Sequence, residues 1–573
     1  MRLTRFFAAL LNPVEQRLVT RSIVIGVIVW ATVHTLKYAT NWTFETIQLW
    51  VEGTGNLLWV LVPLLLGALV MAAFSRYGVT MLNYRTSDGH IHKLVDVRGD
   101  GMERAIALYY SSEPALEQTM MGDEGVNVRW KLPTWSLVLR KSLATLVTIG
   151  TGGSGGLEAS VTLIGESLSA GLFKPRRAPL GKIRHSPLAQ KLWRWWSSSN
   201  PDELQAAQLA GIAAAISAYL GAPFTAAFFA VEVMYRRRPV LEKLIFALIS
   251  ALVAYFLNLV VGGQQRAFEP AFMPRPPITA GYYLLLALLA FSVAMTGILL
   301  ERLRLAVVNF YQNANFNDWQ RHLTGALLTG VIALLIVALT GEKLDLILGT
   351  GDRMVEAALD GQITLQIALA ALVGKMLATT FTIGSGGSAG FLVPSLFFGT
   401  MTATILSRLF GYPPILLIIP AMTASLVSIV NIPLAATFFV VEIFGSAYLL
   451  PALVVLVLTL IFTHDTSIYR TQREEYQGRQ LIPGYSTRRV MVPPAWDGQT
   501  IIGLQIRARY GLNVIGLLEK HPLDGHSPAE PVLNPRVDRP LKTGDSLILL
   551  GQDPALDAFV ESVAGLTSMG DWQ

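Results

Sequence analysis

Long apolar stretches separated by short polar connectors make up most of the 573-residue chain. A helix needs about 20 consecutive apolar residues to cross a bilayer. The stretches that approach or exceed this length are 21–38, 57–75, 136–149, 205–233, 241–262, 279–300, 322–340, 363–383, 391–408, 414–443 and 446–463. They predict an α-helical polytopic membrane protein. Glycine or proline interrupts several of them, which indicates broken or re-entrant helices whose irregular backbone is covered by protein.

Two glycine-rich segments repeat one pattern 234 residues apart, namely Thr148-Ile-Gly-Thr-Gly-Gly-Ser-Gly-Gly-Leu-Glu-Ala-Ser160 and Thr382-Ile-Gly-Ser-Gly-Gly-Ser-Ala-Gly-Phe-Leu-Val-Pro394. A second pair lies 210 residues apart, namely Gly221-Ala-Pro-Phe-Thr-Ala-Ala-Phe-Phe-Ala-Val-Glu-Val233 and Asn431-Ile-Pro-Leu-Ala-Ala-Thr-Phe-Phe-Val-Val-Glu-Ile443. The alternative is that the glycines only allow close packing of membrane helices. That would explain either glycine segment alone, but not two pairs of matching segments in the same order. The repeats predict a transporter fold of two related halves, with binding where broken helices meet.

The first glycine segment has the features of an anion site. Gly155 and Gly156 allow the backbone to approach a ligand closely, and a helix that begins near Leu157 directs its positive end there. Glu158 places a carboxylate in this apolar region, where a charge is costly and usually functional. We interpret Glu158 as a gate or proton carrier; the alternative is a structural cap of its own helix. The turn 98–104 before a short helical stretch through Tyr110 is a weaker anion-site candidate.

Composition narrows the class of protein. Hydrophobic residues make up 52% of the chain and charged residues 15%, as in membrane proteins. The net charge of +6 is concentrated in 174–194 and 236–238, which predicts cytoplasmic loops and no nucleic-acid partner. Residues 1–20 have no cleavage site and are expected to be cytoplasmic or interfacial. The eight histidines show no metal-ligand spacing and there is no cysteine, so we expect neither metal, cofactor nor enzyme active site.

Four motifs in order resemble those of the CLC family of chloride channels and chloride/proton exchangers, over roughly residues 20–472. They are Arg98-Gly-Asp-Gly-Met-Glu103, Gly155-Gly-Leu-Glu-Ala-Ser160, Gly390-Phe-Leu-Val-Pro394 and Thr466-Ser-Ile-Tyr469. The resemblance implies a CLC-type inverted-repeat fold, a homodimer with one anion path per subunit, and Glu158 as the gating glutamate. The anion-binding positions that it implies are Asp100, Gly101, Gly155, Gly156, Gly390, Phe391, Leu392 and Tyr469. The amides of Phe391 and Leu392 and the Tyr469 hydroxyl are the central donors among them.

The sequence departs from the family pattern at three places. Asp100 stands where many members have a serine, and an ionised aspartate repels chloride. Leu157 stands where an arginine usually precedes the gating glutamate, and Ala159-Ser160 replaces Gly-Pro after it. Val233 occupies the position of the internal glutamate that collects protons in exchangers. Its neighbour Glu232 has a twin, Glu442, in the other half, which favours a structural role for both over a proton relay.

The chain becomes polar after the last apolar stretch, with a basic linker at 473–486 and a soluble pattern over 487–573. We predict strands 488–492, 512–519 and 545–550, helices 499–510 and 553–563, and a proline-rich loop at 522–540. Residues 485–566 resemble the RCK-C or TrkA-C regulatory domain of potassium transporters and channels. That resemblance implies dimerisation and a small effector such as a cyclic dinucleotide; the alternative is a dimerisation domain without a ligand.

These features together predict a chloride channel with a glutamate gate, in a bacterial inner membrane with both termini cytoplasmic. A chloride/proton antiporter, with a substitute for Val233, is the nearest alternative. A pathway that prefers fluoride or nitrate remains open. So does a C-terminal sensor attached to a vestigial pore.

Overall fold

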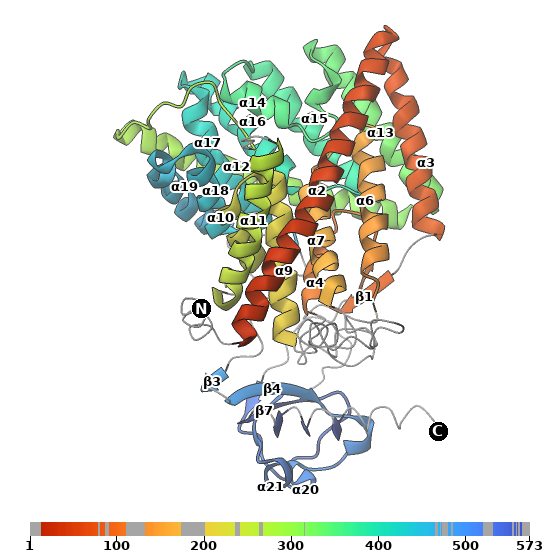
Figure 1. Ribbon diagram of the computed structural model, residues 1–573, viewed down its shortest axis with the longest axis vertical. Helices are drawn as coiled ribbons and strands as arrows, with labels where there is room; N and C mark the ends of the chain where they lie inside the picture. Colours follow the sequence, from red (N-terminus) through yellow and green to blue (C-terminus); the bar gives the residue numbers. More distant parts are fainter. Residues whose placement is uncertain are drawn as a thin grey trace, which may run out of the picture. The chain divides into compact units, whose positions relative to one another are not determined.

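The computed structural model of the protein describes most of the chain. The described residues are 13–77, 81–85, 91–110, 132–173, 201–234, 241–262, 267–314, 316–463, 468–469, 472, 480–482, 485–518, 531–552, 555–556, 558–559 and 562–563. They form two compact units, one with the apolar helices and one with the C-terminal strands. Seven helices in the described part are long and apolar enough to cross a membrane. Both the helical fold class and the small C-terminal sheet domain agree with the sequence prediction (Figure 1).

The first unit is built almost entirely from helices. They are α2 (Pro13–Gly53), α3 (Leu61–Tyr77), α4 (Met102–Tyr110), α6 (Trp135–Gly150), α7 (Glu158–Phe173), α9 (Pro201–Leu220), α10 (Pro223–Glu232), α11 (Leu244–Gly262), α12 (Ala280–Asn313), α13 (Asp318–Thr340), α14 (Asp352–Leu359), α15 (Leu365–Gly384), α16 (Leu392–Phe410), α17 (Pro414–Ser425), α18 (Pro433–Phe444) and α19 (Leu449–Phe462). Two short strands, β1 (Met81–Arg85) and β2 (Ile91–Val95), pair with each other in the polar connector that follows α3, and their residues are divided between the two units. The first unit also contains short 3-10 helices, namely η1 (Leu57–Val60), η4 (Leu241–Lys243), η5 (Leu344–Leu346) and η7 (Ser446–Tyr448).

Two apolar stretches that were too long for one span are broken, as the sequence predicts. The stretch 205–233 divides into α9 and α10 at Gly221, whose φ is +68°, followed by Pro223 at the start of α10. The stretch 414–443 divides into α17, a π-helical turn η6 (Leu426–Val430) and α18, with a break at Asn431 (φ +62°). At 1.5 Å per residue, the 10 residues of α10 and the 12 of α18 are too short to cross a bilayer.

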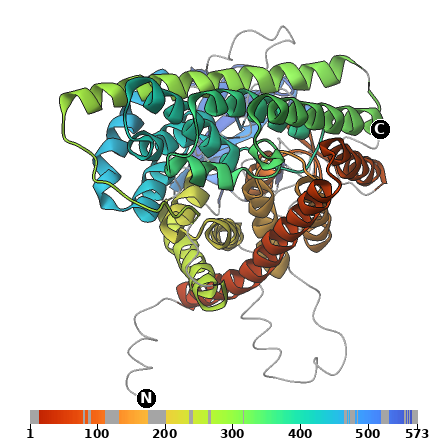
Figure 2. The same cartoon turned by 90° about the horizontal axis from the view of Figure 1, so that it is seen from above.

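Helix α2 is longer than the apolar stretch 21–38. It begins at Pro13 and continues for 41 residues, so it includes residues 13–20 of the segment expected to be cytoplasmic or interfacial. Residues 1–12 lie outside the described part. α2 and the 34-residue α12 lie on opposite sides of the helical unit (Figure 2).

The two glycine segments meet at the centre of the unit and make equivalent contacts. The Ser388 amide donates to the Thr148 hydroxyl at 3.0 Å, and the Ser154 amide donates to the Thr382 hydroxyl at 3.2 Å. The hydroxyls of Thr145 and Ser388 lie 2.8 Å apart, and those of Thr379 and Ser154 lie 2.9 Å apart. Each half therefore supplies polar partners to the other half.

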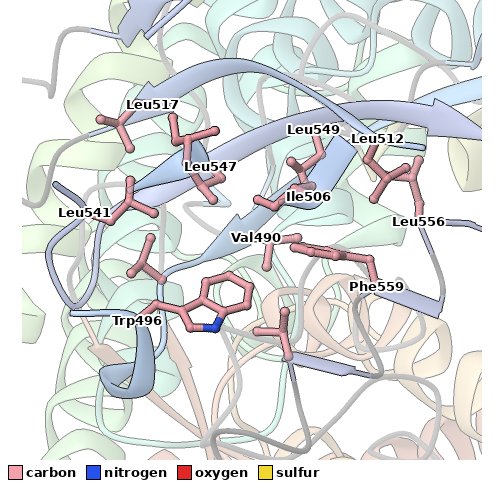
Figure 3. Close-up of a cluster of buried hydrophobic side chains, with 13 residues drawn as sticks. Val490, Trp496, Ile506, Leu512, Leu517, Leu541, Leu547, Leu549, Leu556 and Phe559 are labelled. Atoms are coloured by element: carbon pink, nitrogen blue, oxygen red, sulfur yellow. The ribbon is translucent and has the colours of Figure 1, made fainter. Parts of the chain in front are cut away.

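The C-terminal unit is a small antiparallel sheet with a buried apolar face. Its strands are β3 (Gln480–Ile482), β4 (Tyr485–Met491), β5 (Asn513–Leu518), β6 (Pro531–Leu533) and β7 (Ser546–Gln552), in the spatial order β3-β4-β7-β5-β6. Its core is formed by Val490, Val492, Trp496, Ile501, Ile506, Leu512, Leu517, Leu541, Leu547, Leu549, Leu556, Phe559 and Val563 (Figure 3). Phe559 contacts the rings of Trp496 and Tyr510, so it closes one end of this core.

The C-terminal secondary structure corrects the sequence prediction in two places. The predicted helix 499–510 is two short helices, α20 (Ile501–Leu504) and α21 (Ile506–Tyr510), because Gln505 adopts a left-handed conformation with φ +49°. The predicted loop 522–540 contains strand β6, which pairs with β5. Most of the remaining turn, 519–530, and parts of the predicted helix 553–563 lie outside the described residues. A short 3-10 helix, η8 (Pro494–Trp496), follows β4.

Candidate functional site

The backbones of Gly156 and Gly390 pair directly and bring the two glycine segments together. The Gly156 amide donates to the Gly390 carbonyl at 2.9 Å, and the Gly390 amide donates to the Gly156 carbonyl at 2.7 Å. Helix α7 begins two residues after Gly156, and α16 begins two residues after Gly390. The N-terminal ends of both helices therefore face one point, where their free amides and dipoles favour negative charge.

The Glu158 side chain occupies this point. Its carboxylate Oε1 accepts a hydrogen bond from the Val393 amide at 3.0 Å, and the Leu392 amide and its own amide also face it. The side chain is 0% exposed. Its other oxygen, Oε2, has no hydrogen-bond partner among the described residues. A carboxylate thus fills the place that the helix ends prepare for an anion.

The neighbouring glycines are required for this close approach. A Cβ atom added at Gly156 would lie 2.0 Å from Glu158 Oε2, and one added at Gly390 would lie 2.6 Å from Glu158 Oε1. Gly155 has a φ of +154°, and a Cβ atom added to it would lie 2.6 Å from the Ala389 Cβ. Only glycine leaves room at these positions for both the backbone bridge and the carboxylate.

Asp100 and Gly101 lie at the N-terminal end of α4. The Met102 amide donates to Asp100 Oδ1 at 3.0 Å, so the aspartate caps this helix. Gly101 has φ +87°, and an added Cβ would lie 3.2 Å from Leu163 Cδ2 on α7. The turn therefore contacts the helix that carries Glu158, about one and a half turns further along it.

Tyr469 is fully buried and is fixed by its backbone. The Ile468 amide donates to the Ile429 carbonyl in η6 at 3.0 Å, which anchors the segment beside the broken helix. The structure thus places Tyr469 next to the turn that separates α17 from α18.

Val233 and Glu232 stand at the end of α10. Val233 is buried, and its carbonyl accepts a hydrogen bond from Gln472 Nε2 at 3.0 Å. The Glu232 carboxylate accepts from the amides of Leu434 and Ala435, both at 2.9 Å, at the start of α18. Glu232 is therefore held as a cap of a helix in the other half of the fold.

Glu442 makes the reciprocal contact. Its carboxylate accepts from the Phe224 amide at 3.1 Å and the Thr225 amide at 2.9 Å, at the start of α10. The rings of Phe228 and Phe438 stack between the two helices with centroids 4.2 Å apart. Each carboxylate caps the broken helix of the other half, which is the structural arrangement that the repeat predicts.

Two buried lysines belong to the same central arrangement and were not identified from the sequence. Lys141 Nζ donates to the Gly99 carbonyl at 2.8 Å, and Lys375 Nζ donates to the Gly349 carbonyl at 2.7 Å. Lys375 lies 234 positions after Lys141, the same offset as the glycine repeat. Extending the repeat towards the N-terminus of each half would have revealed this pair.

The described part of the chain contains no cluster of three or more histidine, aspartate or glutamate residues able to hold a metal ion. The site is instead built from backbone amides, a carboxylate, a phenol and buried ammonium groups. Such a set of groups is suited to binding and releasing a small anion.

Comparison with known proteins agrees with this arrangement. Residues 110–464 match the family model for voltage-gated chloride channels. The chain is 26% identical over 351 residues to the voltage-gated ClC-type chloride channel ClcB of Salmonella typhimurium, covering 59% of this chain and 76% of that protein. It is 25% identical over 356 residues to the H(+)/Cl(-) exchange transporter ClcA of Vibrio vulnificus, covering 60% of this chain and 69% of that protein.

A solved structure shares the fold of the helical unit. A CLC-type fluoride/proton antiporter superposes with a TM-score of 0.60 and 20% identity, covering 80% of this chain and 98% of that one. The RCK C domain of the potassium transport protein KtrA, in complex with c-di-AMP, is 31% identical over 14% of this chain and 88% of that chain, with a TM-score of 0.12. Since the matching model covers residues 110–464 of 573, the chain belongs to the CLC family of voltage-gated chloride channels and is a multi-pass membrane anion transporter.

Proposed function

We propose that the protein conducts chloride passively and that Glu158 gates the pathway. The observation that supports this most is the position of the Glu158 carboxylate, which accepts the Val393 amide at the start of α16. An anion and this carboxylate compete for the same helix ends, because both need the same donors. The pathway is therefore closed while the ionised carboxylate is bound, and it opens when the carboxylate is protonated or displaced.

The amides at the start of α16 and the Tyr469 hydroxyl offset the loss of hydration when chloride enters. The anion site that we propose comprises the amides of Phe391 and Leu392, the Tyr469 hydroxyl, and the glycines Gly155, Gly156 and Gly390 around them. The helix dipoles supply a fixed positive field at the site. Because these are partial charges and not full cations, chloride is attracted but can still leave. Asp100 and Gly101 line the approach from the α4 end.

Passive conduction is favoured over exchange because the usual inner proton acceptor is missing. Val233 has no ionisable group, and Glu232 is engaged by two amides of α18 at 2.9 Å. Proton-coupled exchange is the second candidate, since relatives of this chain are named as exchangers. Fluoride as the transported ion belongs to this second candidate, since a structure of this fold is titled a fluoride/proton antiporter.

We further propose a homodimer in which each subunit has its own pathway, in a bacterial inner membrane with both termini in the cytoplasm. The C-terminal domain would regulate conduction, with a small nucleotide as effector. The sequence resemblance of residues 485–566 supports this part of the proposal. Binding of an effector without any anion flux would favour a sensor instead.

The test is chloride efflux from liposomes that contain the purified protein. Glu158→Gln keeps the size of the side chain and removes its charge, so we expect efflux to lose its dependence on pH and to rise. Glu52→Gln, an exposed residue near the end of α2, is the matched control and should leave efflux unchanged. Equal efflux and equal pH dependence in Glu158→Gln and wild type would remove Glu158 from the gate.

A further inference from the structure

Apolar side chains enclose the start of the first glycine segment. Gly152 in this segment has a φ of +108°. A Cβ atom added to it would lie 3.5 Å from Leu64 Cδ2 on α3 and 3.6 Å from Leu348 Cδ1, which precedes the turn into α14. Two leucines therefore fill the space around this part of the segment.

The start of the second glycine segment has the same geometry but polar neighbours. Gly386 stands 234 positions after Gly152 and also has a φ of +108°. A Cβ atom added to it would lie 2.9 Å from His322 Cε1 on α13 and 3.6 Å from Arg98 Cδ, which precedes the turn into α4. An imidazole and the stem of a guanidinium side chain thus take the places of the two leucines.

Helices α3 and α13 are equivalent elements of the two halves. Leu64 and His322 lie 258 positions apart in the chain, and so do Gly67 and Gly325. A Cβ atom added at Gly67 would lie 2.2 Å from a hydroxyl oxygen of the first glycine segment, and one added at Gly325 would lie 2.1 Å from a hydroxyl oxygen of the second. His322 therefore occupies the place of Leu64 in the other half.

The turns before α4 and α14 are equivalent in the same way. Arg98 and Leu348 lie 250 positions apart, and the glycines that follow them both have a φ of +65°. The two helices lie towards opposite ends of the helical unit (Figure 1). Since leucine fills this place in one half, packing does not require an arginine in the other. The charge of Arg98 therefore calls for a function.

A second arginine reaches the same part of the glycine segment. Arg321, next to His322 on α13, donates from Nη2 to the Gly384 carbonyl at 2.7 Å. Arg98 forms an ion pair with Asp318, which lies one turn before Arg321 on the same helix. These contacts hold both guanidinium groups at the start of the second glycine segment.

Both arginines keep hydrogen-bond donors that the described residues do not fill. The Nε atoms of Arg98 and Arg321 are buried and have no hydrogen-bond partner in the described part of the chain. A guanidinium group has five N–H donors, and buried donors without a partner are costly unless water or an ion fills them. Guanidinium groups bind anions through such N–H groups, so the two arginines are suited to an anion.

Arg304 on α12 is a third arginine near this segment. It lies one turn before Val307, and a Cβ atom added at Gly384 would lie 2.7 Å from Val307 Cγ1. Its Nε and Nη2 atoms are likewise buried and unfilled within the described residues. In the first half the residue that packs against the equivalent glycine is Thr43 on α2, and Thr40 lies one turn before it. This arginine too has a neutral counterpart in the other half.

We propose that Arg98 and Arg321, with Arg304 beside them, bind one small monovalent anion at the α4 end of the pathway. The proposal rests on the proposed function, in which chloride passes between the glycine segments. The site holds chloride before it reaches the helix ends at Glu158. Because the equivalent positions at the α14 end are neutral, the site belongs to one side of the pathway only.

Two carboxylates in this region limit how tightly the anion is held. Asp318 takes one donor of Arg98, and Asp100 stands two residues after Arg98, with its carboxylate on the Met102 amide. Both carboxylates repel an anion, whereas the arginines attract it. This balance suits a pathway, in which an anion must bind well enough to enter and weakly enough to leave.

The experiment measures chloride current in planar bilayers while the chloride concentration is varied on one side at a time. Gluconate replaces chloride, so the ionic strength and the screening of fixed charges stay constant. A tag at the N-terminus, before α2, identifies the α4 side, because Figure 1 shows the start of α2 at that end of the helical unit. The quantity to compare is the chloride concentration that gives half-maximal current on each side.

Arg98→Leu introduces the residue that the other half carries at this position. It should raise the half-maximal concentration on the α4 side by about tenfold or more, because a charge-assisted hydrogen bond to the anion is lost. The value on the opposite side should stay unchanged. Asp318→Asn should have the reverse effect, since it frees a donor of Arg98 and lowers the α4-side value by up to about fivefold. A purely structural ion pair would give no such decrease.

Arg353→Leu is the matched control. Arg353 is an exposed arginine on α14 that also pairs with a carboxylate, Glu45. Its replacement removes the same charge and the same kind of ion pair beside the equivalent turn at the other end of the helical unit. The half-maximal concentration on the α4 side should stay unchanged in this variant.

The inference is overturned if Arg98→Leu leaves the α4-side value unchanged, if Asp318→Asn does not lower it, or if Arg353→Leu raises it as much as Arg98→Leu does. If Arg98→Leu does not yield folded protein, Arg98→Gln removes the same charge and is read in the same way. Failure of the proposed function looks different. It appears as a wild-type reversal potential that moves with a pH gradient, while the α4-side values of the variants still decide whether the arginines bind the anion.

Discussion

Replacement of Gly156 by alanine should displace the gate without touching its charge. The added methyl group would lie 2.0 Å from Glu158 Oε2 and 2.4 Å from Oε1. Gly156 does not have a left-handed backbone, so alanine introduces no conformational strain there. The neighbouring carboxylate is the mobile end of a flexible side chain, and it has to leave its position beside the start of α16.

The size of the effect follows from the hydrogen bond that is lost. The Val393 amide donates to the Glu158 carboxylate at 3.0 Å. A hydrogen bond to a charged group contributes about 1.5–3 kcal/mol, which corresponds to roughly a 10- to 150-fold shift of the closed state towards the open state. The methyl group also narrows the anion site slightly whether or not Glu158 is present, so the difference between its effects in the two backgrounds is the quantity to compare.

The assay is a double-mutant cycle of chloride efflux with Gly156→Ala and Glu158→Ala. Gly156→Ala should change efflux strongly when Glu158 is present and by no more than about twofold when Glu158 is alanine. Gly281→Ala is the control, since an added Cβ there has no neighbour within 4 Å. The same factor in both backgrounds would refute the reasoning, because Gly156 would then act independently of the carboxylate.

Three further predictions concern the surrounding structure. Glu232→Gln should lower the melting temperature of the purified protein, because it weakens a charged cap of α18 by about 1–2 kcal/mol, and should leave the proton response intact. An altered proton response with unchanged melting would assign Glu232 to a relay. Lys375→Met should also lower the melting temperature, because the buried carbonyls of Ile347 and Gly349 lose their hydrogen-bond donor. Each unsatisfied carbonyl costs about 1–3 kcal/mol of folding stability, and an unchanged melting temperature would contradict this. Leu549→Ala should cost about 2–5 kcal/mol in the C-terminal core and increase protease cleavage after residue 473, while the membrane unit melts as before. Simultaneous loss of both units would show that they unfold as one.

The repeats explain how much of the fold could be predicted from the sequence. The spacing of Glu232 and Glu442 predicted equivalent positions in two halves, and the structure shows them capping each other's broken helix. Gly221 and Pro223 predicted the break between α9 and α10, because neither residue continues a helix there. These features depend on local chemistry that is visible along the chain.

Contacts between distant segments could not be predicted in the same way. The Val393 amide reaches a carboxylate 235 residues earlier in the chain, and the direction of a backbone N–H leaves no trace in the amino-acid sequence. The same holds for Lys141 and Lys375, whose partners are main-chain carbonyls. The predicted helix 499–510 is likewise divided at Gln505, whose left-handed backbone is not visible in the continuous apolar pattern of that stretch.

The setting of Asp100 also depends on the fold. The sequence identified Asp100 as a departure from the family and left its charge and orientation open. The structure places it at the start of α4, where its carboxylate accepts a hydrogen bond from the Met102 amide and its turn lies against α7.

The central claim, passive chloride conduction through a glutamate gate, is tested most directly by the reversal potential of the wild-type protein in liposomes or bilayers. With a fixed chloride gradient, the reversal potential should stay at the chloride equilibrium potential when a pH gradient is imposed, although the size of the current changes. A reversal potential that moves with the pH gradient, together with protons driven uphill by chloride, would contradict the claim and show an exchanger.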